Sequence, residues 1–139
     1  MKRVAAVVLL KESGAALFQL RDNKPGLPCA NQWSLPSGRC ESTETLKDCA
    51  KRELKEETAY QCEALQDLLT LQPDHDGYER YQMTAFWAPY DGLQTLQCLE
   101  GQAIQFIERS DAKSYAIPEF ILKVWDLATG NLEGERPSN

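Results

Sequence analysis

Residues 45–58 constrain this chain more than any other segment, because a helix built from them carries carboxylates on its apolar side. At about 100° per residue, the apolar residues gather on one stripe and the lysines on the opposite, solvent-facing side. Glu53 and Glu57 fall within the angular range of the apolar stripe, and Glu56 lies at its edge. A core helix should not present acids there, so these three glutamates are the first candidates for a functional site.

Burying three carboxylates together is unfavourable, because each loses its hydration and each repels the others unless a cation compensates them. A hard divalent metal is the natural cation. Magnesium takes oxygen ligands, and it needs few of them from the protein where phosphates and waters complete its coordination. An ordinary charged face in solvent is the alternative. The pattern therefore favours a Mg²⁺ site at this helix.

The charge balance of the chain limits its partners. With 21 acidic and 15 basic residues, the chain has a net charge of -6 at neutral pH. Proteins that bind nucleic acid or anionic membranes nonspecifically need a basic surface, so we expect neither partner. A nucleotide ligand stays possible, because a bound metal can supply the positive charge that its phosphates need.

Length and local pattern predict one domain over residues 1–130, followed by a flexible tail over residues 131–139. Strands are expected at residues 4–11, 15–21, 62–71, 78–87 and 103–108, helices at residues 45–58 and 117–128, and a proline-rich loop at residues 23–36. The first helix should begin after Thr45, with Asp48 as the acid of a capping box. The first two strands should form a hairpin through the turn at residues 12–14. The apolar stripe of the second helix is expected in the core: Phe120, Ile121, Val124, Trp125 and Ala128.

The cysteines and the histidine indicate no thiol or imidazole chemistry. Five cysteines without a Cys-x-x-Cys pair favour the reduced thiols of a cytoplasmic protein over a disulfide framework or a zinc ribbon. His75, the single histidine, lies in a polar sequence that is typical of a turn. The apolar run after Met1 ends at Lys11 and Glu12, so it predicts a buried strand, not a signal peptide or a membrane span.

Fixed positions in and before the first helix together resemble the Nudix box. The family pattern is Gly, five residues, Glu, seven residues, Arg-Glu, an aliphatic residue, any residue, Glu-Glu, any residue, Gly and an aliphatic residue. The chain matches the first glycine and every charged position with Gly38, Glu44, Arg52, Glu53, Glu56 and Glu57. It departs from the pattern at Ala59 and Tyr60, and Ser37 stands in the Gly-Gly pair that often precedes the box. The order and length of the predicted elements extend the resemblance to Nudix hydrolases over nearly the whole chain.

This resemblance, to the single-domain MutT-like members, implies an α/β/α sandwich around a mixed sheet and Mg²⁺- or Mn²⁺-dependent hydrolysis of a nucleoside diphosphate linked to another moiety. The implied metal ligands are the Gly38 carbonyl and the carboxylates of Glu53, Glu56 and Glu57. Glu44 and Arg52 are implied to hold the loop and orient a ligand glutamate. The base that accepts a proton from the attacking water stays open between Glu53 and Glu100, and Glu100 is also a candidate ligand from a late loop.

The resemblance favours cleavage of a nucleoside triphosphate, including an oxidised one, to monophosphate and pyrophosphate by a monomer or a homodimer. Alternatives are hydrolysis of a nucleotide sugar, ADP-ribose or a dinucleotide polyphosphate, and a non-catalytic nucleotide-binding role. Arg21, Lys24 and Arg39 are candidate phosphate ligands, with solvated surface charge as the alternative. Candidate stacking residues for a base, with burial in the core as the alternative, are Phe18, Trp33, Tyr78, Tyr81 and Trp87.

Two departures from the family pattern carry their own expectations. An alanine at position 59 does not easily take the left-handed backbone of the usual glycine, so the turn should be reshaped or strained by about 1 kcal/mol. Ser37 in place of a glycine should change how closely the backbone approaches a phosphate.

Overall fold

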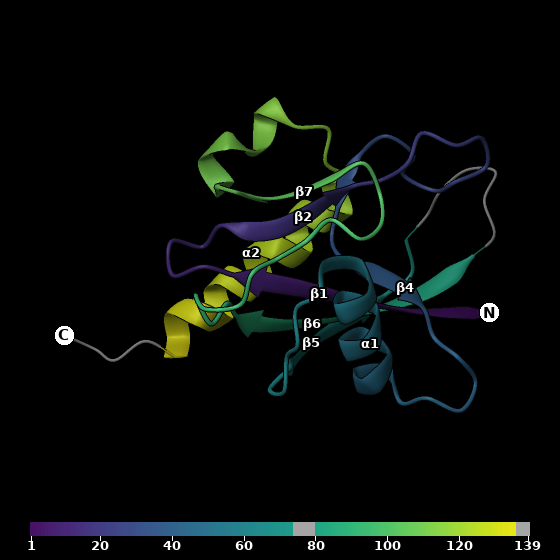
Figure 1. The fold of residues 1–139 in the computed structure, drawn as a ribbon, viewed down its shortest axis with the longest axis horizontal. Helices are drawn as coiled ribbons and strands as arrows, with labels where there is room; N and C mark the ends of the chain where they lie inside the picture. The colour runs from purple at the N-terminus through teal and green to yellow at the C-terminus, as the bar shows by residue number, and fades with distance from the viewer. Residues whose placement is uncertain (74–79, 136–139) are drawn as a thin grey trace.

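A mixed β-sheet with one long helix on each face forms the body of the molecule (Figure 1). The computed structural model describes residues 1–73 and 80–135. In chain order the elements are β1 (Lys2–Leu10), β2 (Ala16–Leu20), β3 (Trp33–Ser34), β4 (Ser37–Arg39), α1 (Leu46–Thr58), β5 (Gln66–Leu71), β6 (Tyr81–Pro89), β7 (Ala103–Ile107), the 3₁₀ helix η1 (Arg109–Ser114) and α2 (Glu119–Glu135). The predicted α/β fold with a mixed sheet is confirmed.

The seven strands follow the order β3-β2-β1-β6-β5, with β4 pairing β1 and β7 pairing β2. β1 runs parallel to β6 along its whole length, whereas it pairs β2 and β4 in antiparallel fashion. In the β1–β4 pair, Gly38 lies opposite Ala5. Since α1 also packs on β1 and β4, the start of β4 and the middle of α1 come together on one side of the sheet.

Strand β1 is buried on both faces. It directs Ala6 and Val8 into the core beneath α2, and Ala5 and Val7 into the core beneath α1. Because successive side chains of a strand point to opposite faces, a strand covered by helices on both sides reads as a continuous apolar run. This explains why residues 4–11 predicted a buried strand.

The predicted hairpin and helix start are confirmed, and the predicted loop contains a strand. Leu10 pairs Ala16 across the β1–β2 turn. Thr45 caps α1, since its Oγ1 accepts a hydrogen bond from the backbone N–H of Asp48 at 3.1 Å. β3 lies within the region predicted as loop, and β4 lies directly after it.

Helix α2 continues to Glu135, so residues 131–135 of the segment predicted as a tail are helical; residues 136–139 lie outside the described residues. Leu132 anchors the extension, because it packs into the core cluster beneath α2. Four predicted core positions are buried, namely Ile121, Val124, Trp125 and Ala128. None of the helices in residues 1–73 and 80–135 has the length and apolarity that a membrane crossing needs.

A disulfide joins Cys40 to Cys49, which contradicts the expectation that the cysteines are all reduced thiols. Cys40 directly follows β4 and Cys49 lies in the first turns of α1, with their Cα atoms 5.3 Å apart. The bond was not predictable from an odd number of cysteines, because the path of the loop between β4 and α1 decides which two of them meet.

Candidate functional site

A pocket of about 690 Å³ is bordered by β1, β2, β4, β6, α1 and the start of α2. Three acids line it, namely Glu53, Glu57 and Glu100. Its apolar wall includes Leu27, Pro28, Met83, Phe120 and Ile121. The pocket thus has an acidic part and an apolar part, and the apolar part can pack against a flat ring.

Glu57 lines the pocket although it is only 3% exposed. Its Oε2 accepts a hydrogen bond from the backbone N–H of Ser37 at 3.0 Å. Burial, and after it the nearby charges of Glu100 and Glu53, raise the pKa of Glu57 to about 9. A buried acid among like charges keeps its proton until a cation compensates it, so this carboxyl is suited to bind a metal.

Gly38 lets the Glu53 carboxylate lie directly against the backbone of β4. A Cβ atom at position 38 would overlap that carboxylate, so no larger residue fits there without displacing it. Burial raises the pKa of Glu53, and Arg52 partly opposes the shift. Gly38 and Glu53 therefore stand together on the pocket wall.

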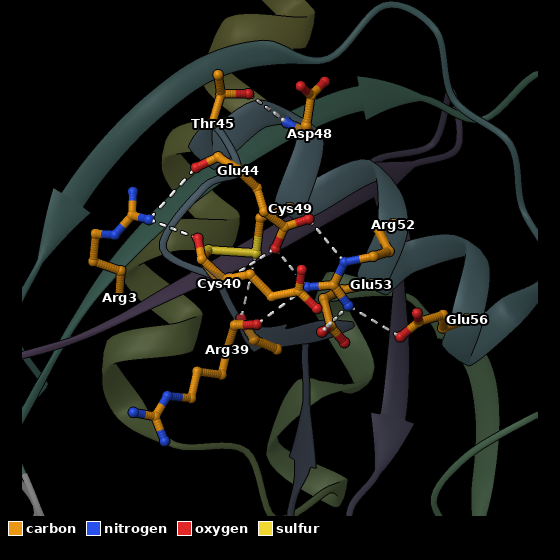
Figure 2. Close-up of a disulfide and its surroundings, with 12 residues drawn as sticks. Arg3, Arg39, Cys40, Glu44, Thr45, Asp48, Cys49, Arg52, Glu53 and Glu56 are labelled. Atoms are coloured by element: carbon orange, nitrogen blue, oxygen red, sulfur yellow. Dashed lines mark hydrogen bonds and ion pairs between the residues drawn. A yellow bond between two sulfur atoms is a disulfide. The ribbon is translucent and has the colours of Figure 1, made fainter.

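Figure 2 shows Arg52 among three glutamates. Its Nε and Nη2 donate to the two carboxylate oxygens of Glu44 at 2.8 and 2.6 Å, and its Nη1 donates to Glu53 Oε1 at 2.8 Å. Its Nη2 also donates to the Arg39 carbonyl at 3.2 Å. These hydrogen bonds lower the pKa of Glu44 to about 2 and raise that of Arg52. Arg52 thus ties the loop after β4 to α1 and orients Glu53.

Glu100 reaches the same pocket from the segment before β7. The neighbouring Leu99 donates its backbone N–H to the Glu57 carbonyl at 3.0 Å, which places this segment against the end of α1. The charge of Glu100 contributes to the raised pKa of both Glu53 and Glu57. The structure therefore brings together three of the acids that the sequence singled out.

Glu56 lies apart from these three acids. Its side chain is 55% exposed, and its Oε2 accepts a hydrogen bond from Arg52 Nη1 at 3.2 Å. It lines a different groove, together with Lys51 and Lys55. The position of Glu56 at the edge of the apolar stripe explains why it turns away from the pocket.

The acids of the pocket are of the ligand type that a divalent metal prefers, but their side chains are too far apart in this structure to bind one together. Within residues 1–73 and 80–135, no three His, Cys, Asp or Glu side chains stand close enough together to hold a metal ion. Every candidate donor is nevertheless an oxygen, and a bound cation would relieve the raised pKa values of Glu53 and Glu57.

Two of the three candidate phosphate ligands, Arg21 and Arg39, line the pocket. Lys24 is not among the residues that line the pocket. Its exposed ammonium lies 3.7 Å from an Asp22 carboxylate oxygen. Lys2, which the sequence did not single out, lines the pocket from the start of β1. The alternation of a strand, which puts every second residue on the pocket side, is the signal that could have found it.

Among the candidate stacking aromatics, Tyr81 lines the pocket, and burial raises its pKa to about 12. Three others pack in or against the core: Phe18, Trp33 and Trp87. Tyr78 and His75 lie outside the described residues. Phe120, predicted as core, is only partly buried and lines the pocket. It lies in the first turn of α2, and this end of the helix borders the pocket.

Known proteins resemble this chain in sequence. The family model of the NUDIX domain matches residues 1–123. A curated protein of Caenorhabditis elegans named "Putative nudix hydrolase 1" is 34% identical over 113 residues, which make up 80% of this chain and 30% of that protein. The chain therefore spans about three tenths of the length of this relative.

Solved structures resemble the fold. An Ap4A hydrolase of Caenorhabditis elegans has a TM-score of 0.79 at 20% identity, covering 96% of this chain and 99% of that one. The NUDIX domain of Shewanella oneidensis NrtR, complexed with ADP ribose, has a TM-score of 0.78 at 20% identity, covering 94% and 87%. A MutT NUDIX hydrolase of Burkholderia pseudomallei has a TM-score of 0.79 at 16% identity, covering 91% and 96%. At such low identities these likenesses establish the fold alone.

Proposed function

Because the chain belongs to the Nudix hydrolase family, we propose that it hydrolyses the pyrophosphate linkage of a nucleoside diphosphate derivative, with Mg²⁺ or Mn²⁺ bound in the pocket. The preferred substrate is a nucleoside triphosphate, including an oxidised one, and the products are the monophosphate and pyrophosphate. The gathering of Glu53, Glu57 and Glu100 in one pocket beside Gly38 carries this proposal. Such a pocket needs a cation before it can accept a phosphate.

The proposed metal ligands are Glu53, Glu57 and Glu100, with the Gly38 carbonyl beside them. The metal would supply positive charge that makes a bound water more acidic and offsets the charge of the phosphates. Glu56, the remaining ligand candidate from the sequence, would have to turn toward the pocket from the groove that it lines. Glu44 and Arg52 act from outside the pocket by holding Glu53 in place.

The remaining steps fall to side chains of the pocket wall. Glu53 and Glu100 are the two candidates for accepting the proton of the attacking water. Arg21 and Arg39 are placed to bind phosphate oxygens. Tyr81 and Phe120 border the apolar part of the pocket, where a nucleobase can stack and exclude water.

ADP-ribose or a dinucleotide polyphosphate is the second candidate class of substrate. Two proteins of the same fold favour it: one is an Ap4A hydrolase and the other is a NUDIX domain complexed with ADP ribose. Both compounds contain the same pyrophosphate linkage, so the same acids would act on them.

A product-resolved screen tests the proposal. Purified protein is incubated with Mg²⁺ or Mn²⁺ and with nucleoside triphosphates, oxidised purine triphosphates, nucleotide sugars, ADP-ribose and dinucleotide polyphosphates. Pyrophosphate release from a triphosphate that stops on chelation supports the first class, and nucleoside monophosphate released from ADP-ribose supports the second. Folded protein that hydrolyses nothing in the panel contradicts the proposal and favours a binding role.

A further inference from the structure

Gln19 is a polar side chain that β2 buries in the wall of the pocket. It is 3% exposed and lies between Phe18 and Leu20 in the strand. A buried amide needs a hydrogen-bond partner, because losing water without one is costly. Gln19 Nε2 donates to the backbone carbonyl of Glu100 at 3.1 Å. The amide therefore binds the residue that carries the third acid of the pocket.

Residues 97–102, called here the Glu100 strap, are tied at both ends. Toward one end, the backbone N–H of Leu99 donates to the Glu57 carbonyl at 3.0 Å. At the other end, the backbone N–H of Gln102 donates to the Leu20 carbonyl at 2.8 Å. Gln19 holds the strap between these two ties, at the residue whose carboxylate enters the pocket.

Gly101 brings the strap into close contact with Gln19. Its φ of +80° is a backbone conformation that glycine takes easily, and a Cβ atom there would meet the Leu20 carbonyl oxygen at 2.8 Å and Gln19 Cγ at 2.9 Å. The backbone of the strap thus lies directly on the Gln19 side chain. The position of the strap depends on both the hydrogen bond and this packing.

We propose that Gln19 is a positioning residue that sets where the Glu100 carboxylate stands in the metal-binding pocket. The inference rests on the proposed function, in which Glu100 is an acid of the metal site. By holding the carbonyl of Glu100, Gln19 fixes the backbone of a residue that lines the pocket together with Glu53 and Glu57. Loss of the amide would weaken the metal site by displacing a ligand, without changing the charge of the pocket.

Binding of Mn²⁺ alone, measured by electron paramagnetic resonance on metal-free protein, tests this role without substrate. Gln19→Leu and Glu100→Gln should each weaken Mn²⁺ binding by roughly tenfold. The double variant should bind no more weakly than Glu100→Gln, because Gln19 acts through Glu100. Gln105→Leu is the matched control: Gln105 Nε2 donates to the Tyr115 hydroxyl at 2.8 Å outside the pocket, and this variant should bind as the wild type does.

Wild-type Mn²⁺ affinity in Gln19→Leu or in Glu100→Gln would overturn the proposal. A double variant whose loss of Mn²⁺ affinity equals the product of the two single losses would overturn it as well. If thermal melting shows that Gln19→Leu does not fold, Gly101→Ala disturbs the same contact from the strap and should weaken binding similarly; wild-type affinity there would also overturn the proposal. The expected Mn²⁺ pattern in a protein that hydrolyses no substrate would leave the positioning role intact and contradict the proposed function alone.

Discussion

Glu57 holds a proton at neutral pH in the metal-free protein, because its pKa is raised from 4.5 to about 9. Between these two values the folded chain binds more protons than the unfolded chain. The free energy of unfolding of the metal-free protein should therefore fall as the pH rises through this window. A carboxyl must ionise to bind a metal, so metal binding should release this proton.

We accordingly expect Mn²⁺ affinity to rise between pH 6 and 8, by at most about tenfold per pH unit, with about one proton released per ion. Isothermal titration calorimetry in buffers of different ionisation enthalpy measures both quantities. An affinity that is flat with pH, with no proton release, would contradict the account of Glu57.

Ala59 ends α1 with a φ of 68° and a ψ of 1°, a left-handed conformation that an alanine takes only at a cost. The sequence left open whether this turn is reshaped or strained, and the positive φ shows that it keeps the left-handed conformation and is strained. Ala59→Gly should raise the free energy of unfolding by about 1 kcal/mol in denaturant titrations. Ala116→Gly, at an exposed site where φ is not positive, should lower it, because glycine adds freedom to the unfolded chain. Equal effects of the two substitutions would contradict the strain at position 59.

How far individual site residues can be predicted depends on the kind of pattern that carries them. Helical periodicity placed Glu53 and Glu57 on the buried stripe, because one helix fixes their relative directions. Glu100 came from family resemblance alone. Gln19 was missed, because its role depends on a hydrogen bond to a segment far along the chain, which no local pattern encodes.

At the scale of elements, the disulfide closes the loop between β4 and α1 that carries Glu44 (Figure 2). A cross-link over a sequence separation of 9 restricts the unfolded chain, which corresponds to about 2–3 kcal/mol in the loop-entropy model. The double variant Cys40→Ala, Cys49→Ala should lose about this free energy of unfolding.

Chemical denaturation with and without a thiol reductant measures the contribution of the disulfide. Reductant should lower the stability of the wild type toward that of the double variant and leave the double variant unchanged. A wild type that is equally stable in both conditions would show that the cross-link contributes nothing.

The long elements were predictable from sequence, and the short ones and the helix end were not. β1 and α1 have enough residues for an apolar pattern to appear. β3 and β4, with two and three residues, are too short to show one. The sequence after Gly130 is polar enough to suggest a tail, yet Leu132 packs into the core and keeps α2 helical to Glu135.

For the whole molecule, the α/β class followed from the order of strands and helices, but the pocket did not. Its wall combines residues of β1, β2, β4, β6, α1, α2 and the Glu100 strap. Only the sheet order, with β6 parallel to β1 and with β2 and β4 both pairing β1 in antiparallel fashion, brings these segments to one place. The spacing of residues along the sequence does not predict that these segments meet.

In the proposed function, the acids of this pocket hold the metal that hydrolysis requires. Its most direct test measures Mn²⁺ affinity and metal-dependent hydrolysis on the same preparations of wild type, Glu57→Gln and Glu63→Gln, the last an exposed acid outside the pocket. Glu57→Gln should lose at least about tenfold in affinity and about a hundredfold in rate, with Glu63→Gln unchanged. Wild-type binding and turnover in Glu57→Gln would contradict the account.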